Sequence, residues 1–284
     1  MFEQLSRIEN RGSTLDTIFK ILSDDPGCTM AKNSLEAFLD AAMKNDDAKA
    51  QYIGQGIGFD FNTAHTLWIL HGGFNGSKRE ERYNALTKWA READSFFGKI
   101  SKKAHIAFRG DGIAIFMECI PYAELEEGSE QDFLSGFAYN PASLTAFHKL
   151  CSIEDIRHAI ELHDDFIFYA SKVYPKKQVF YEQDLQFAGL CKLIAASGKI
   201  FSLRSLLEPL RDNKSGDVLA DTLATYLLDA DGSAQKAGDL MHQHKNTIQY
   251  RLHVIQQRLS LDIKKMPANF NLYLAVGIDR LTQS

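Results

Sequence analysis

The sequence predicts a mixed α+β protein with several domains: N-terminal helices, a ferredoxin-like α/β sandwich, a helical linker and a C-terminal all-α module. Between residues 56 and 182, short apolar runs alternate with amphipathic helical segments. From residue 217 onward the apolar residues recur only at helical spacing. The chain has 284 residues, which is enough for two domains and a helical extension.

The first 55 residues predict helices. Apolar residues from Leu15 to Leu22 recur at helical spacing, and the sequence DDPG at 24–27 ends that helix. A second helix is predicted from about Ser34. Its apolar face is formed by Leu35, Phe38, Leu39 and Met43. We expect a helical lead-in or a dimer contact here, because the segment is too short for a ligand-binding domain.

The central segment predicts a sheet covered by helices. The apolar run 66–70 ends at a glycine pair and predicts a strand, and 78–97 predicts an amphipathic helix. Strands at 105–109 and 113–118 flank Gly110-Asp111-Gly112, which is typical of a tight hairpin. A strand near 133–138, a helix at 153–172 and a strand at 178–181 follow. This order, β-α-β-β-(β)-α-β, is that of a ferredoxin-like sandwich. Helices are predicted again over 184–230, with breaks at Pro209 and Gly216.

Composition and charge narrow the class of protein. No apolar run approaches the ~18 residues that span a bilayer, and the first residues, MFEQLSRIENRG, lack the apolar stretch of a signal peptide, so we expect a cytoplasmic protein without a membrane partner. The four cysteines show no CxxC spacing, so we expect buried free thiols, no metal and no cofactor. The net charge is −5, but residues 231–284 hold seven Lys or Arg and four Asp, a charge of +3. A basic module on an acidic body suits DNA binding.

The C-terminal module predicts two helices joined by a turn. Ser233 is a good N-cap for a short helix from Ala234 to Met241, and 242–245 form the turn. A longer helix begins near Asn246. Its apolar stripe is Ile248, Leu252, Ile255 and Leu259, and it packs on Ala237, Gly238 and Met241. The opposite face presents Asn246, Gln249, Tyr250, His253 and Gln257, flanked by Lys245 and Arg251. Periodicity alone leaves two interpretations open: a DNA-binding helix-turn-helix, or a plain αα-hairpin with a solvated polar face.

The residues 244–252, HKNTIQYRL, resemble the H-[RK]-N-T-[LIV]-x-Y-R-L signature of PucR-type regulators. This family includes the purine-catabolism regulators and the sugar-diacid regulators of the CdaR type, and its helix-turn-helix is Fis-like. The resemblance includes LADTLATYLL at 219–228, Leu261-Asp262 in a "GLD" turn with Ser260 in place of Gly, and the closing helix at 272–281. Gly238 stands where Ala is usual, and His242 and Gln243 replace two apolar positions. We expect these departures to loosen the hairpin slightly.

The resemblance implies roles for individual residues. It implies that Lys245, Asn246, Gln249, Tyr250 and His253 face the DNA groove, where Gln and Asn can bind adenine and Lys can meet guanine or phosphate. For Thr247 it leaves two roles, capping the helix or touching a phosphate. Arg251 either contacts the DNA backbone or holds the preceding helix.

The central segment resembles the degenerate GGDEF-like domain of the same family. The resemblance rests on Gly56–Asp60, on 154–184, and on Arg109–Ile115 at the place of the GGDEF hairpin. It implies four segments: 1–55 helical, 56–183 GGDEF-like, 184–215 a helical linker and 216–284 the helix-turn-helix domain. A cyclase of this fold needs carboxylates for two metal ions. Here the first strand ends in His71-Gly72-Gly73 without an acid, and the hairpin offers Asp111 alone.

We therefore expect a sequence-specific transcription regulator that is not an enzyme and that responds to an unknown small metabolite. Its partners would be double-stranded operator DNA and a second copy of the chain. For the homodimer interface we expect the acidic body, with the N-terminal helices and the helices of 184–210. The alternative is a nucleotide cyclase or nucleotide-sensing GGDEF-like protein with an appended DNA-binding tail. No P-loop, HExxH or GxSxG motif is present.

Overall fold

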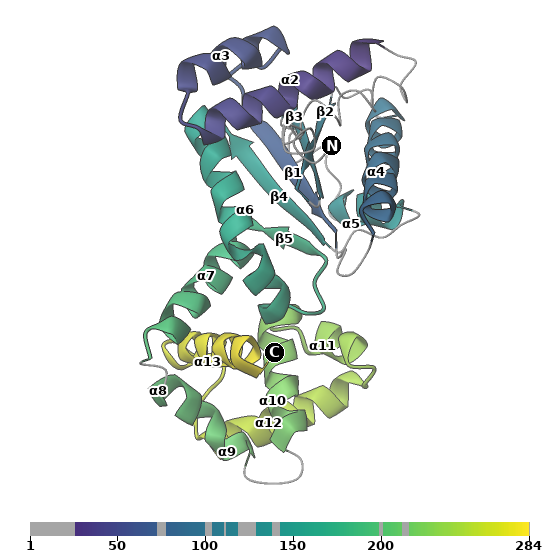
Figure 1. Ribbon diagram of the computed structural model, residues 1–284. Helices are drawn as coiled ribbons and strands as arrows, with labels where there is room; N and C mark the ends of the chain where they lie inside the picture. Colours follow the sequence, from purple (N-terminus) through teal and green to yellow (C-terminus); the bar gives the residue numbers. More distant parts are fainter. Residues whose placement is uncertain are drawn as a thin grey trace, which may run out of the picture. The chain divides into compact units, whose positions relative to one another are not determined.

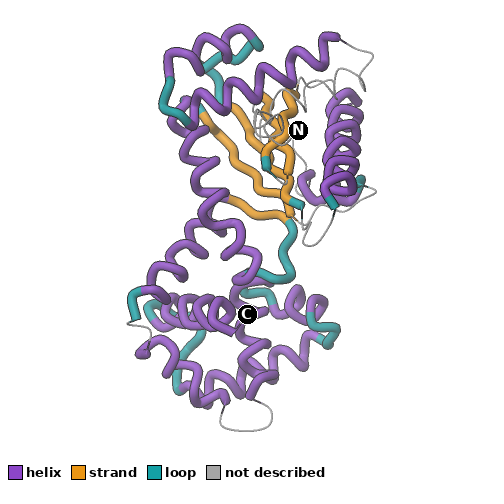
Figure 2. Tube along the Cα trace, in the orientation of Figure 1, coloured by secondary structure: helices purple, strands orange, loops and turns teal. Residues whose placement is uncertain are grey.

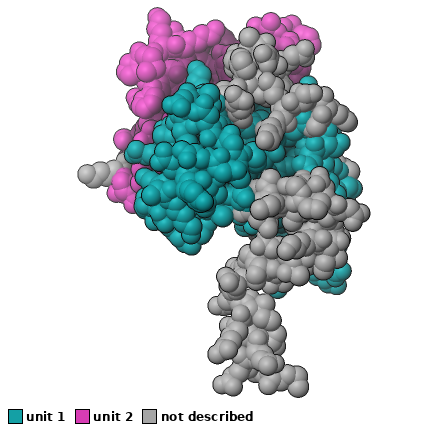
Figure 3. All heavy atoms as spheres, turned by 90° about the horizontal axis from the view of Figure 1, so that it is seen from above, with its two compact units in different colours: residues 1–160 teal, residues 161–284 magenta. Residues whose placement is uncertain are grey.

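A computed structural model describes residues 26–72, 78–99, 104–110, 112–118, 129–137, 143–198, 201–211 and 216–283. These residues form helices and one five-stranded sheet, which confirms the mixed α+β class (Figures 1 and 2). Contacts divide the chain into two compact units, unit 1 (residues 1–160) and unit 2 (residues 161–284), coloured separately in Figure 3. The four segments expected from the sequence stay a prediction, and the helix expected near Leu15 lies outside the described residues.

The elements of unit 1 come from the first part of the chain. They are α2 (Pro26–Met43), α3 (Asp47–Gly56), β1 (His65–His71), α4 (Arg79–Lys99), β2 (Ala104–Arg109), β3 (Gly112–Glu118), α5 (Ser129–Ser135), β4 (Ser143–Leu150) and the start of α6 (Ile153–Val173). Unit 2 holds the rest of α6, β5 (Val179–Tyr181), α7 (Glu182–Ala196), α8 (Phe201–Arg204), the 3-10 turn η1 (Ser205–Leu207), α9 (Glu208–Arg211), α10 (Gly216–Ala224), the π-helical turn η2 (Thr225–Asp229), α11 (Ala234–Leu240), α12 (Lys245–Leu259) and α13 (Ala268–Gln283).

The strand order is β2-β3-β1-β4-β5, and β1 runs antiparallel to both β3 and β4. The hairpin predicted between β2 and β3 is confirmed, because Arg109 pairs with Gly112 across a two-residue turn. Gly110 has a φ of +55°, which two-residue hairpin turns require. A Cβ on Gly112 would lie 1.9 Å from the carbonyl oxygen of Leu70, so only glycine fits beside β1.

The strand predicted near 133–138 is wrong. Helix α5 occupies this region, with two acidic residues in its first turn and Phe133 buried toward the sheet. The fourth strand is instead β4, which the sequence analysis missed. Its residues Ser143 and Thr145 are buried alongside apolar ones, so the polar residues masked the strand pattern.

Helix α2 begins at Pro26, eight residues before the predicted start, because proline suits the first turn of a helix. Its Phe38 ring lies 5.2 Å from the ring of Phe59 and 6.1 Å from that of Phe116. A Glu36 carboxylate oxygen accepts a hydrogen bond from the backbone N–H of Phe108, 3.1 Å away, on the edge strand β2. Helix α2 therefore packs on one face of the sheet and covers its edge.

The other face of the sheet packs on α4 and α5. The indole of Trp68 on β1 lies 5.7 Å from the ring of Phe97 on α4 and 5.0 Å from that of Phe133 on α5 (centroid distances). Trp68 and Trp89 are each 1% exposed. Both tryptophans of the chain thus report on the core of unit 1.

The cysteines only partly follow the expectation of buried free thiols. Cys191 is buried against α13, and this burial raises the pKa of its thiol to about 12. Cys151, however, is exposed, so the expectation is wrong there. The side chains of Cys28 and Cys119 lie outside the described residues. Over the described part of the chain, the structure contains no helix long and apolar enough to cross a bilayer.

Candidate nucleic-acid interface

A buried ion pair holds the entry to the C-terminal helices of unit 2. The guanidinium of Arg280 on α13 donates to both carboxylate oxygens of Asp229, at 3.0 and 2.7 Å, and to the carbonyl of Val173 at 2.7 Å. The two side chains are 13% and 1% exposed. The pair fixes the end of η2, from which the chain turns into α11. From the sequence, Arg280 is visible only as part of the basic charge of the module.

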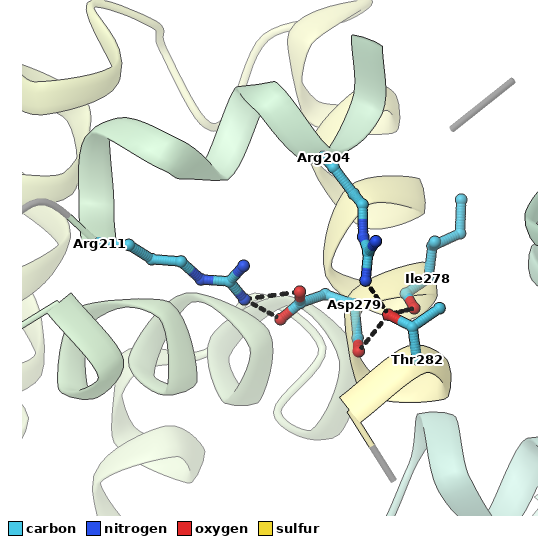
Figure 4. Close-up of polar contacts among 5 residues, drawn as sticks. All are labelled: Arg204, Arg211, Ile278, Asp279 and Thr282. Carbon is cyan, nitrogen blue, oxygen red and sulfur yellow. Dashed lines mark hydrogen bonds and ion pairs between the residues drawn. The ribbon is translucent and has the colours of Figure 1, made fainter. Parts of the chain in front are cut away.

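A second set of contacts ties residues 201–211 to α13 (Figure 4). Arg211 donates to the carboxylate of Asp279 at 2.6 and 2.5 Å, and Arg204 donates to the hydroxyl of Thr282 at 2.9 Å. Arg258 of α12 reaches the carbonyl of Leu210 at 3.4 Å. The segment predicted as a linker is therefore packed against the C-terminal helices of the same unit.

Helix α11 begins where the sequence predicts. The turn before it contains Asp231 and Gly232, both at positive φ. The Ser233 hydroxyl accepts a hydrogen bond from the backbone N–H of Lys236 at 3.3 Å, which confirms the predicted N-cap. One free N–H at the start of the helix is thereby satisfied.

The turn between α11 and α12 is tighter than expected. The N–H of Gln243 donates to the carbonyl of Gly238 at 2.8 Å, that of His242 donates to the carbonyl of Asp239 at 3.3 Å, and His242 has a φ of +53°. These are the bonds of a Schellman motif. A Cβ at Gly238 would lie 2.6 Å from the carbonyl oxygen of Gln243. The glycine in place of the usual alanine thus allows a closer approach, contrary to the expected loosening.

The predicted apolar stripe of α12 faces inward. Ile248 and Ile255 are fully buried and Leu252 is 8% exposed, while Leu259 at the helix end is half-buried. On α11, Ala237 and Gly238 are buried where the helices meet. Small residues let the backbones approach closely. This geometry is that of a helix-turn-helix, with α11 and α12 as its two helices.

The opposite face of α12 is exposed and polar. Tyr250 is 69% exposed, although it is a large aromatic residue. The exposed residues of this face, at spacings that place them on one side of a helix, are Asn246, Gln249, Tyr250, His253 and Gln257. His253 and Gln257 contact each other at 3.0 Å, whereas among the described residues no side-chain partner is found for Asn246, Gln249 or Tyr250. The helix therefore presents donors and acceptors to solvent over about three turns.

The three other residues with a predicted DNA contact, Lys245, Thr247 and Arg251, differ in their exposure and contacts. Lys245 is exposed at the first position of α12. The N-cap of α12 is His244, whose Nδ1 accepts a hydrogen bond from the backbone N–H of Asn246 at 3.2 Å. The predicted capping role of Thr247 is therefore wrong. The phosphate contact of Thr247 stays a prediction. Arg251 is half-buried and donates to the hydroxyl of Thr222 on α10 at 3.4 Å. The helix that Arg251 contacts is thus α10 and not the preceding helix α11, and a contact with the DNA backbone stays a prediction.

The end of α12 offers a test of its geometry. Ser260 has a φ of +51° and stands where the family pattern has glycine. A side chain at this conformation costs about 1 kcal/mol, which glycine avoids. We expect Ser260→Gly to raise the free energy of unfolding by about 1 kcal/mol, measured by urea denaturation followed by circular dichroism at 222 nm. Ser260→Ala is the matched control and should give no gain. A loss of stability in Ser260→Gly would contradict this conformation.

The described residues of unit 1 show no comparable site. Among the described residues, no group of three or more His, Cys, Asp or Glu is placed to hold a metal ion. Asp111 and residues 73–77, where a cyclase of the resembled fold would place its acids, lie outside the described part of the chain. Two hollows border α4, of about 570 and 190 Å³, and the smaller is walled by Phe96, Phe133 and Phe137.

Comparison with known proteins points to the same C-terminal residues. The family model of the PucR C-terminal helix-turn-helix domain matches residues 219–278. No curated protein sequence matches the chain. Among solved structures, a regulator of polyketide synthase expression from Bifidobacterium adolescentis is similar at 13% identity. The match covers 92% of this chain and 96% of that chain, with a TM-score of 0.37.

Proposed function

Since residues 219–278 form a PucR C-terminal helix-turn-helix domain, which makes the chain a DNA-binding transcription regulator, we propose that α12 is its recognition helix. The helix would lie in the major groove of double-stranded operator DNA, with its N-terminal residues on base edges. The observation that supports this most strongly is the exposed polar face of α12, where Asn246, Gln249 and Tyr250 lack an internal side-chain partner among the described residues.

Each residue of the face has a proposed part. Asn246 and Gln249 carry amides that can bind adenine bidentately, and Lys245 can reach a guanine or a phosphate. Tyr250 and His253 would complete the groove contact, and Thr247 would touch a phosphate. Arg251 donates to Thr222 through one nitrogen of its guanidinium, so we assign it to holding α10.

The chain would act as a homodimer that responds to a small metabolite. One recognition helix covers about half a turn of groove, and a symmetric operator needs two of them ~34 Å apart. The α/β sheet of unit 1 is the proposed place for the effector, because the C-terminal helices are occupied with DNA binding. An effector that binds one dimer state more tightly would shift the population toward that state.

Salt dependence tests this proposal, because each phosphate contact releases counterions. Exposed lysines of the module are Lys236, Lys245, Lys264 and Lys265, whereas Arg258 and Arg280 are engaged inside the unit. Two to four contacts per subunit predict a log–log slope of about −4 to −7 for a dimer. The measurement is fluorescence anisotropy on an operator selected from a random DNA library.

Lys245→Met should reduce the slope of the dimer by about two, since one contact per subunit is lost. Lys44→Met, at an exposed lysine just after the end of α2, is the control and should leave the slope unchanged. A slope near zero for the unaltered protein would contradict binding to the DNA backbone.

A further inference from the structure

Helix α6 exposes an aromatic side chain within unit 2. Phe168 is 60% exposed, although burying a phenylalanine side chain is favourable. It lies on a stripe of exposed residues that follows the helix at three- and four-residue spacing: Glu161, Asp164, Asp165, Phe168 and Ser171. The half-buried Lys172 continues this stripe. Its ammonium lies 4.8 Å from the centroid of the Phe168 ring.

Two charges of this stripe, Asp164 and Lys172, lie at equal spacing on either side of Phe168, and Glu161 and Asp165 add further acids before it. Asp164 lies four residues before it and Lys172 four residues after it, so all three share one face of the helix. The acidic end of the stripe precedes the phenylalanine and the basic end follows it. If two copies of this helix were placed antiparallel with Phe168 at the centre, Asp164 of each copy would meet Lys172 of the other. At these two positions the surface is therefore complementary to a second copy of itself.

We propose that two copies of the chain associate through α6, antiparallel, with Phe168 on the two-fold axis. A two-fold contact uses the same patch on both subunits, as this stripe does. The inference rests on the proposed function, which requires two recognition helices on one operator. The stripe and α12 belong to the same unit, so this contact would join the two DNA-binding units directly. It places the interface on α6 instead of on the helices of 184–210.

Charge reversal tests the contact by sedimentation velocity at micromolar concentration without DNA. Asp164→Lys alone sets lysine against lysine at both ends of the contact, and Lys172→Asp alone sets aspartate against aspartate. Each should weaken self-association about ten-fold. Mixing the two variants should restore the dimer, because each end then pairs lysine with aspartate. The double variant Asp164→Lys/Lys172→Asp should also dimerise.

Phe168→Asp should weaken self-association by about 30-fold or more, as expected for a central anchor. Asp217→Lys, at an exposed residue of α10, is the control and should leave it unchanged. Circular dichroism verifies that each variant is folded. A dimer that withstands both Phe168→Asp and the single reversals, or a mixture that fails to re-associate, would overturn the α6 contact. Failure of the proposed function is distinguishable, since it shows as loss of salt-dependent DNA binding by the unaltered protein.

Discussion

Replacing Arg280 by leucine is expected to lower the free energy of unfolding of the protein by about 3–5 kcal/mol. The carboxylate of Asp229 is 1% exposed, and Arg280 supplies both of its charged hydrogen bonds. Without the guanidinium, a charge remains buried and uncompensated, and the carbonyl of Val173 loses a donor as well. Urea denaturation followed by circular dichroism at 222 nm measures the loss. Tryptophan fluorescence follows unit 1 in parallel.

Two further variants serve as controls for this prediction. Arg280→Leu combined with Asp229→Leu removes both charges, so it should recover much of the lost stability. Lys236→Met also breaks an ion pair of a basic and an acidic side chain, here with Asp231. Because these two side chains are 66% and 75% exposed, the free energy of unfolding should fall by less than about 1 kcal/mol. Equal effects of Arg280→Leu and Lys236→Met would contradict the assigned role of the buried pair.

The helix-turn-helix could be predicted from the sequence because its signals are local. The stripe of Ile248, Leu252 and Ile255 has helical spacing, and Ser233 is the predicted N-cap. The ion pair of Asp229 and Arg280 joins residues 51 apart in the chain, so no local pattern indicates it. The same holds for the contact of Arg251 with Thr222, which only the packing of α10 on α12 brings about.

The errors in the α/β sheet have a common cause. Strand β4 is an interior strand between β1 and β5, and its Thr145 is 0% exposed, so apolar and polar residues do not alternate along it. Helix α5 is short, and Phe133 together with Phe137, just beyond the end of the helix, suggests a strand. Tertiary packing decides both cases. The hairpin of β2 and β3 was predictable because Gly110 has a local reason to be glycine, the positive φ of its turn.

Mutation of the exposed face of α12 is expected to reduce the affinity for operator DNA strongly. Asn246→Ala combined with Gln249→Ala removes two amides that can each bind a base bidentately, at about 1–3 kcal/mol per contact. We expect affinity for the selected operator to fall at least about 30-fold, while affinity for unrelated DNA changes little, because the lysines remain. Gln183→Ala, at an exposed glutamine of α7, is the control and should leave both affinities unchanged.

The most direct test of the account is therefore a competition gel shift of the Asn246→Ala/Gln249→Ala variant. The operator and a scrambled duplex of equal length compete at one fixed salt concentration. Loss of preference for the operator, with binding to the scrambled duplex retained, is the result that the account predicts. An operator preference equal to that of the unaltered protein would contradict the assignment of α12 as the recognition helix.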